Sequence, residues 1–267
     1  MDLLTDEAAT IAGRFLAARR EAGGLAAYPG DLPVTLESAY AIQDAAIAAW
    51  GKRVAGWKVG RVQPPFAERF GADRLAGPIF NVRSADGAEP EMPVFANGFA
   101  AGEAEFLLRV GATPPPGQAR FTLDEAAALI DEVHVGIEVA SSPLEPINRI
   151  GPVAVISDFG NNNGLVIGPA VEGWRDRGFE SWEVTTSIDG VEAGTGRASA
   201  FPDGAIGAAR FLFELMAKRG IALEPGQWIS SGAVTGVHVA RAGQRVEADF
   251  GGRYRVACRL KAAEPEA

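Results

Sequence analysis

Two glutamates, one residue apart, stand at the start of a strongly apolar stretch. The segment GEAEFLLRVG places Glu103 and Glu105 just before a Phe-Leu-Leu run. If this segment is a β-strand, alternate side chains point to the same face, so the two carboxylates share a face. Buried carboxylates repel each other unless a cation lies between them or one carries a proton. The pair therefore indicates either a metal site or an exposed edge strand whose glutamates pair with arginines.

A third acid follows on another predicted strand, VHVGIEV. In this segment valines and an isoleucine alternate with His134, Gly136 and Glu138, so Glu138 is an acid on an otherwise apolar strand. Three carboxylates from two strands form a hard oxygen site, suited to Mg²⁺ or Mn²⁺ with water or substrate completing the octahedron. We expect His134 to be satisfied by the backbone and not to bind a metal. The pattern by itself leaves the metal site and the edge strand open.

The elements that must position these acids are predicted from periodicity and from Gly and Pro punctuation. Helical patterns cover residues 6–21, 35–50, 122–131 and 203–218, with Thr35 as an N-cap and a capping box between Thr122 and Glu125. Predicted strands are AGWKVGRV, GPIFNV, AEFLLRVG, VHVGIEV, VAVIS and GLVIG. The segment RVEADFGGRYRVACRL predicts a hairpin that turns at Gly251–Gly252. We expect an α+β (mixed α/β) fold in which a helical region, 1–53, and a β-rich core, 54–267, form one unit.

Charge and composition restrict the class of protein. The chain of 267 residues carries a formal net charge of −9, which disfavours nucleic-acid binding because no basic patch offsets it. The single cysteine, Cys258, excludes an internal disulfide and is expected to be a buried, inert thiol. The sequence has neither the basic start of a signal peptide nor an apolar run of about 20 residues. We expect a cytoplasmic protein that binds neither nucleic acid nor membrane.

Six segments together resemble one family. They are AYAIQ (39–43), GWKVG (56–60), GEAEF (102–106), GIEV (136–139), ISDFGNNNGLVIG (156–168) and SGAVTG (231–236). In this order they are similar to the 2-keto-4-pentenoate hydratase / 2-oxohepta-3-ene-1,7-dioate hydratase family of the fumarylacetoacetate hydrolase superfamily. The resemblance covers nearly the whole chain. It implies a β-rich roll or barrel-like core with an N-terminal helical part and peripheral helices, and a homo-oligomer.

The resemblance also implies a site. It makes Glu103, Glu105 and Glu138 the ligands of a divalent metal, Mg²⁺ or Mn²⁺, and Lys58 of GWKVG the catalytic cation near the substrate. We expect partial burial to lower the pKa of Lys58 toward a role in proton transfer. Further substrate-binding residues implied by the resemblance are Asn161, Ser231 and Gly232.

The implied activity is a metal-dependent hydratase that adds water to a 2-hydroxy-2,4-dienoate and forms a 4-hydroxy-2-oxo acid, as in the catabolism of aromatic compounds. Two alternatives are a 4-oxalocrotonate-type decarboxylase on the same metal site and a non-catalytic metal-binding relative. The chain departs from the family at Leu75 and Ala76, where relatives often have an acid suited to proton transfer, and Asp73 is displaced from that place. It also has ASSPLEP after the third glutamate and Ala233 where a threonine is common. Hydrolysis is disfavoured because no histidine precedes His134.

Overall fold

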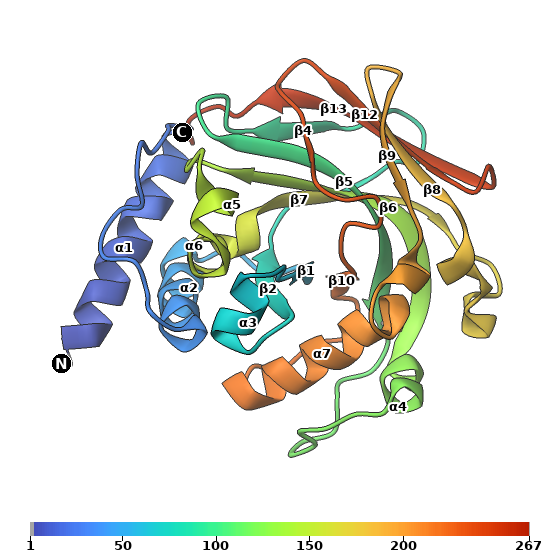
Figure 1. Ribbon diagram of the computed structural model, residues 1–267, viewed down its shortest axis with the longest axis horizontal. Coiled ribbons are helices and arrows are strands. Elements are labelled where there is room, and N and C mark those ends of the chain that lie inside the picture. The colour runs from blue at the N-terminus through green and yellow to red at the C-terminus, as the bar shows by residue number, and fades with distance from the viewer. Residues whose placement is uncertain (1–2, 267) are drawn as a thin grey trace.

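The computed structural model of the protein describes residues 3–266 (Figure 1). Two helices form the N-terminal part. They are α1 (Leu3–Arg20) and α2 (Leu36–Trp50). The side chain of Thr35 caps α2 by accepting a hydrogen bond from the backbone of Ser38, and Gly51 ends the helix in the left-handed conformation. Both features agree with the predicted cap and stop.

Within the described residues, the strands form two mixed sheets. The larger sheet has eight strands, ordered β2-β1-β10-β5-β6-β7-β3, with β11 pairing with β5 beside β10. Its strands are β1 (Gly56–Arg61), β2 (Arg74–Ile79), β3 (Val82–Ser84), β5 (Phe99–Val110), β6 (Ile130–Ser142), β7 (Asn162–Ala170), β10 (Trp228–Ser230) and β11 (His238–Val239). The smaller sheet has five, in the order β4-β13-β12-β8-β9. Its strands are β4 (Glu91–Val94), β8 (Val184–Ile188), β9 (Val191–Gly196), β12 (Arg245–Phe250) and β13 (Tyr254–Ala262).

The remaining helices are short, apart from α7. They are α3 (Phe66–Phe70), α4 (Leu123–Ala128), α5 (Ile147–Ile150), α6 (Pro152–Ser157) and α7 (Gly204–Arg219). Single 3₁₀ turns cover Phe159–Asn161, Trp174–Asp176, Gly178–Ser181 and Ala198–Ala200. Figure 1 shows the long strands β5, β6 and β7 curving through the molecule, with α1 and α2 at one side and α7 across from the smaller sheet.

The core lies where the smaller sheet and α7 pack against the larger one. Phe106 of β5 is completely buried and contacts Phe179 and Phe250 edge-on, at ring-centroid distances of 4.7 and 5.2 Å. Side chains of β5 are buried on both faces over almost the whole strand. A strand covered on both sides holds its polar side chains in a fixed, dry environment, which matters for the glutamates below.

Three sequence predictions need correction. The segment VAVIS is a helix, α6, and not a strand, because Pro152 occupies the first turn after Gly151 and a short apolar run has no diagnostic period. The capped helix at Thr122 ends at Ala128, since β6 begins two residues later. The segment GPIFNV divides between β2 and β3.

The fold class is confirmed as α+β with mixed sheets and several peripheral helices. The capping box between Thr122 and Glu125 is present, and β12 and β13 pair as the predicted hairpin around Gly251 and Gly252. Between residues 3 and 266, none of the helices has the length and apolar character needed to cross a bilayer.

Candidate metal centre

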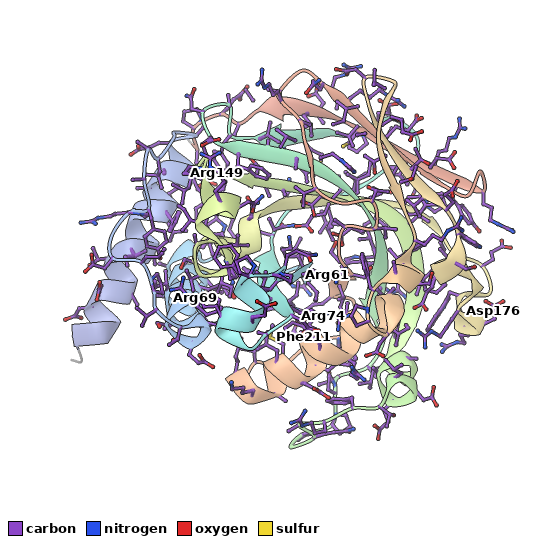
Figure 2. All side chains as sticks on the ribbon, in the orientation of Figure 1. Arg61, Arg69, Arg74, Arg149, Asp176 and Phe211 are labelled. Carbon is purple, nitrogen blue, oxygen red and sulfur yellow. The ribbon has the colours of Figure 1, made fainter. Side chains whose placement is uncertain are left out.

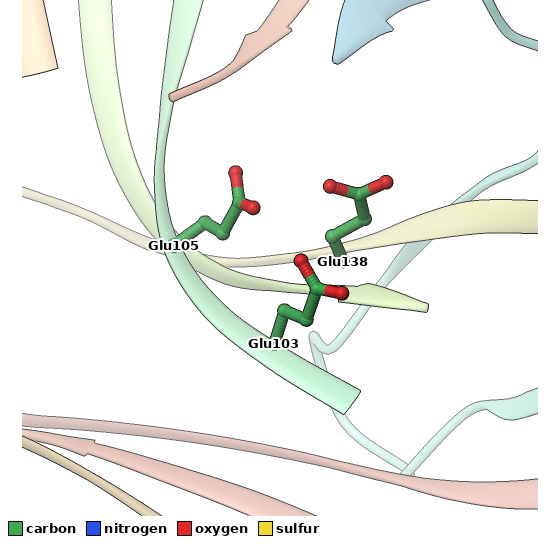
Figure 3. Close-up of side chains that lie close together, drawn as sticks. All are labelled: Glu103, Glu105 and Glu138. Carbon is green, nitrogen blue, oxygen red and sulfur yellow. The ribbon is translucent and has the colours of Figure 1, made fainter. Parts of the chain in front are cut away.

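The three glutamates singled out by strand alternation meet on one face of the larger sheet. Glu103 and Glu105 lie on β5, and Glu138 lies on the neighbouring strand β6 (Figure 3). The antiparallel register pairs Glu103 directly with Glu138 and pairs Glu105 with Gly136. Directly opposite residues have Cβ atoms about 5 Å apart, so the register by itself brings the carboxylates together. Each glutamate offers an oxygen within 4.8 Å of the oxygens of the other two.

These carboxylates are buried. The exposed fraction is 4 % for Glu103 and zero for Glu105 and Glu138. The alternative of an exposed edge strand with arginine partners is therefore wrong, because β5 is central in its sheet and no arginine forms an ion pair with these glutamates in the described part of the chain. Their role as metal ligands remains a prediction.

Hydrogen bonds engage one carboxylate oxygen of Glu105 and one of Glu138 and leave the second oxygen of each without a partner within residues 3–266. Glu105 Oε2 accepts hydrogen bonds from the Ser230 hydroxyl and, at 2.8 Å, from the backbone N–H of Gly232. Glu138 Oε1 accepts one from Asn162 Nδ2 at 2.9 Å and lies 3.2 Å from Lys58 Nζ. The second oxygens, Glu105 Oε1 and Glu138 Oε2, are buried without a hydrogen-bond partner among the described residues. The carboxylates of Glu105 and Glu138 are thus each oriented by one oxygen, while the other oxygen is available to a ligand.

The electrostatics of the cluster show an excess of negative charge. Burial raises the pKa of Glu103 to about 7, an effect that Lys58 opposes and Glu138 reinforces. Burial and the charges of Glu138 and Glu103 raise the pKa of Glu105 well above its usual value. Burial lowers the pKa of Lys58, but the carboxylates of Glu138, Glu103 and Glu105 outweigh it and the net shift is upward. The expectation of a lowered Lys58 pKa is therefore wrong for this arrangement, and Lys58 is a fixed positive charge.

The donor set fits a divalent cation. Three ionised carboxylates and one ammonium leave a formal charge of −2, and the unpaired atoms are carboxylate oxygens, which are hard ligands of the kind Mg²⁺ and Mn²⁺ take. A cation among Glu103, Glu105 and Glu138 would pair the two open oxygens and remove the repulsion that raises the pKa values.

A cavity of about 800 Å³ opens beside this cluster. Its lining includes Glu103, Glu105, Lys58 and Asn161. One continuous space therefore reaches two of the glutamates and the Lys58 ammonium. Among the residues that the structure describes, no acid lines the cavity besides the two glutamates of β5. Leu75 occupies the wall where the family resemblance expects an acid. Asp73 does not line the cavity.

The other predicted substrate residues differ in what they do. Asn161 is 3 % exposed, adopts a left-handed backbone (φ 64°), and leaves its Oδ1 without a partner while lining the cavity. Ser231 is buried with an unpartnered hydroxyl but does not itself line the cavity. Gly232 holds Glu105 through its backbone N–H, so its observed contact is to a glutamate.

Sequence reasoning missed two supporting residues, Ser230 and Asn162. Ser230 reaches Glu105 because β10 pairs with β5, and a pairing between strands more than a hundred residues apart leaves no local signal. Asn162 lies inside the ISDFGNNNGLVIG segment but was not distinguished from its neighbouring asparagines.

His134 and Cys258 lie outside the cluster. His134 Nδ1 hydrogen bonds with the backbone oxygen of Gly168 at 2.8 Å, which confirms a histidine satisfied by the backbone. Cys258 is completely buried, and burial raises the pKa of its thiol to about 12, which fits the expected unreactive thiol.

Comparison with solved structures assigns the fold. No family model matches the sequence. The 4-oxalocrotonate decarboxylase from Pseudomonas putida G7, complexed with calcium and acetate, superposes with a TM-score of 0.81 at 18 % identity, covering 97 % of this chain and 99 % of that one. The protein therefore shares the fold of this decarboxylase over nearly its whole length.

Two other solved structures superpose on this chain over a smaller part of its length. The 2-hydroxyhepta-2,4-diene-1,7-dioate isomerase from Mycobacterium marinum has a TM-score of 0.56 at 17 % identity, covering 78 % of this chain and 76 % of that one. The fumarylpyruvate hydrolase from Pseudomonas aeruginosa, in complex with Mn²⁺ and pyruvate, has a TM-score of 0.54 at 16 % identity, covering 78 % and 89 %. At identities of 16–18 % these superpositions show a shared fold and do not assign the chain to the hydratase family.

Proposed function

We propose that this chain is a divalent-metal-dependent lyase that acts on 2-oxo acids, and that its reaction is the decarboxylation of a 4-oxalocrotonate-type substrate. The observation that carries the proposal is the buried cluster of Glu103, Glu105 and Glu138, with two unpaired oxygens and Lys58 beside it, at one end of a cavity. A 2-oxo acid offers a carboxylate and an adjacent carbonyl oxygen, which together chelate a hard cation.

The residues of the chain would then orient the substrate and stabilise charge. When bound, a divalent cation supplies Lewis-acid stabilisation of the negative charge that develops on the 2-oxo oxygen. Lys58 adds a fixed ammonium that is only 6 % exposed, and a charge at a largely buried position acts more strongly than in solution. The open Oδ1 of Asn161 can accept a hydrogen bond from a water beside the substrate or from the 2-hydroxyl group of the product.

Decarboxylation makes modest demands on the protein. The carbon–carbon bond to the distal carboxyl group breaks and carbon dioxide leaves. The electron pair passes through the conjugated chain to the 2-oxo oxygen, which takes a proton to give a 2-hydroxy-2,4-dienoate. That proton comes from solvent, which reaches the open cavity, while Lys58 keeps its charge and stabilises the oxygen as negative charge develops there. No additional carboxylate is needed.

Water addition is harder to perform with these residues. It requires one group to protonate the far end of the diene and another to activate water, and Leu75 stands in the wall where the resemblance places an acid. The full-length superposition on 4-oxalocrotonate decarboxylase, also seen with its magnesium and adipate complex at a TM-score of 0.80, supports the same choice. Hydration remains the second candidate, because the hydratase-like motifs favour it and both reactions begin with the same chelated acid.

The test is to supply the purified protein with Mg²⁺ or Mn²⁺ and two substrates separately. With 2-oxohex-3-enedioate we expect release of carbon dioxide and appearance of the absorbance of 2-hydroxypenta-2,4-dienoate. With 2-hydroxypenta-2,4-dienoate alone we expect no loss of absorbance; its loss would establish hydration instead. No turnover of either compound by protein with bound metal would overturn the enzyme proposal and favour a non-catalytic relative.

A pair of variants tests the assignment of ligands. Glu105→Gln should abolish metal binding, measured by calorimetry, and with it the activity. Glu132→Gln is the matched control, because Glu132 lies on β6, the strand of Glu138, but pairs with Arg109 and His134 at a half-exposed position. Unchanged metal affinity in Glu105→Gln would show that the ligand assignment is wrong.

A further inference from the structure

One arginine lines the same cavity without a partner for its charge. Arg61 is the last residue of β1, three positions after Lys58, and both residues line the cavity. Its guanidinium lies 5.3 Å from the ring centroid of Phe201, another residue of the wall. Within residues 3–266, the Arg61 side chain forms no ion pair or protein hydrogen bond of its own. Its five donors therefore face solvent and the cavity.

The guanidinium groups of the two neighbouring arginines form hydrogen bonds with the protein, whereas that of Arg61 forms none among the described residues. Arg197 also lines the cavity, but its guanidinium donates to the Ser181 backbone and to Glu183. Arg74 is directly opposite Arg61 in the pairing of β1 with β2, and it donates to the backbone oxygen of Pro202 at 2.6 Å. Of the two arginines that line the cavity, Arg61 is therefore the one whose guanidinium has no partner among the described residues. A free guanidinium attracts anions.

The space between the two ends suits a short carbon chain. Three residues along an extended strand separate the Cα atoms of Lys58 and Arg61 by about 10 Å. Gly60 lies between them in the sequence and also lines the cavity, and a Cβ at this position would come within 3.3 Å of Leu75 Cδ1. The adjoining wall is apolar and consists of Val62, Phe66, Leu75, Pro152 and Val155. One end of the cavity therefore suits a cation-bound 2-oxo acid, and the other suits an anion.

We propose that Arg61 binds the distal carboxylate of the substrate and makes this site specific for dicarboxylic 2-oxo acids. The inference rests on the proposed function, since it takes the first carboxylate to be held at the glutamate cluster. A planar guanidinium forms paired hydrogen bonds with a carboxylate, and its face already rests on Phe201, which limits its freedom before binding. In this role Arg61 sets which substrate binds and takes no part in the proton transfer.

The experiment measures binding with two ligands that differ only in the distal charge. Metal-loaded protein is titrated by calorimetry with 2-oxoadipate and with 2-oxohexanoate, neither of which has the unsaturated chain needed for turnover. We expect 2-oxoadipate to bind about tenfold more tightly, as for a charged hydrogen bond at a partly hydrated site. In Arg61→Gln this preference should disappear, while the affinity for 2-oxohexanoate stays the same. In Arg61→Lys part of it should remain.

Arg69 provides a matched control. It lies on α3, its guanidinium is 5.0 Å from the ring of Phe70, and, in the part of the chain that the structure describes, it too forms no ion pair or protein hydrogen bond. It lines a different depression from that of Arg61, and Figure 2 labels both side chains. Arg69→Gln should retain the preference for 2-oxoadipate. With the true substrate, Arg61→Gln should raise KM without lowering kcat, since the distal carboxylate loses its charge as carbon dioxide leaves and Arg61 therefore holds the bound substrate more strongly than the transition state.

Two outcomes separate this inference from the proposal it rests on. If 2-oxohexanoate binds in a metal-dependent manner but wild type shows no preference for 2-oxoadipate, or if the preference survives in Arg61→Gln, the role of Arg61 is overturned and the 2-oxo acid site stands. If neither ligand binds to the metal-loaded protein, the proposed function itself fails.

Discussion

Two clusters of buried charge in this protein differ in how completely their atoms are paired. In the first, Arg19 of α1 donates to Asp158 at 2.5 Å, and the Ser142 hydroxyl donates to the other carboxylate oxygen at the same distance. Arg19 further donates to Asn163 Oδ1 and to the Ser141 backbone, and its guanidinium lies 5.1 Å from the ring centroid of Phe159. Charge and hydrogen bonds balance within this cluster.

The second cluster does not balance. Glu103, Glu105 and Glu138 face one ammonium, that of Lys58, and two of their buried oxygens have no partner among the described residues. Leaving buried charge and hydrogen-bonding capacity unpaired is costly, and this imbalance supports the proposed metal site. The comparison teaches that burial of charge alone does not mark a site. The balanced cluster joins the N-terminal helix to the core, whereas the unbalanced one has room for a cation.

The largest expected effect comes from breaking the balanced cluster. Asp158→Ala leaves the Arg19 guanidinium buried without its anion, which should lower the free energy of unfolding by about 3–5 kcal/mol, measured by urea denaturation. Glu145→Ala, which removes the exposed ion pair with Arg149, is the control and should cost at most about 1 kcal/mol. Equal losses in the two variants would contradict a structural role for the Arg19–Asp158 pair.

The unbalanced cluster should respond with the opposite sign. In metal-free protein, Glu105→Gln should raise the free energy of unfolding by about 1 kcal/mol, because it removes a buried charge that its neighbours repel. The amide oxygen can still accept from Ser230 and Gly232, while its NH₂ group faces the other carboxylates. The same variant should lose the increase in Tm that Mg²⁺ gives the wild type. A loss of stability as large as that of Asp158→Ala would mean that the glutamates are structural.

Two adjacent asparagines allow the comparison to be tested one residue apart. Asn162 donates to Glu138, whereas Asn163 accepts from Arg19 and donates to the Pro93 backbone at 2.7 Å. Asn162→Ala should weaken Mg²⁺ binding by about 10- to 100-fold, as expected when a residue that orients a ligand is lost. Asn163→Ala should instead cost about 1–2 kcal/mol of stability and leave Mg²⁺ affinity unchanged. Calorimetry measures the Mg²⁺ affinity of both variants and urea denaturation measures their stability. If both quantities change equally in the two variants, the two clusters do not differ in function.

The sequence predicted those parts of the site that depend on local pattern. Alternation along two strands placed Glu103 and Glu105 on one face and singled out Glu138 on an apolar strand, because a period of two needs no knowledge of the partner strand, but it left open whether these acids are buried. The cap at Thr122 and the end of α2 at Gly51 were predictable for the same reason, since each depends on residues within one helical turn. The family resemblance then added Lys58, which alternation alone would have left as an unexplained charge.

Pairings between distant strands and helices were not predictable. Ser230 reaches Glu105 only through the pairing of β10 with β5, and Arg19 meets Asp158 across a separation of 139 residues. The helix at Pro152 was missed because the four apolar residues of VAVIS fit a buried strand and a buried helix equally well. In each case the deciding contact is far away in the sequence.

The last prediction concerns protons at the unbalanced cluster. The pKa of Glu103 is raised to about 7 in metal-free protein, so this carboxyl is mostly protonated at pH 6 and mostly ionised at pH 8. A cation must displace that proton, and Mg²⁺ affinity should therefore fall about tenfold between pH 8 and pH 6. Calorimetry in two buffers of different ionisation enthalpy should detect about one more proton released at pH 6 than at pH 8. The control Glu132→Gln, at a position away from the cluster, should show the same difference in proton release as the wild type. Equal proton release at pH 6 and pH 8 in the wild type would contradict the raised pKa of Glu103.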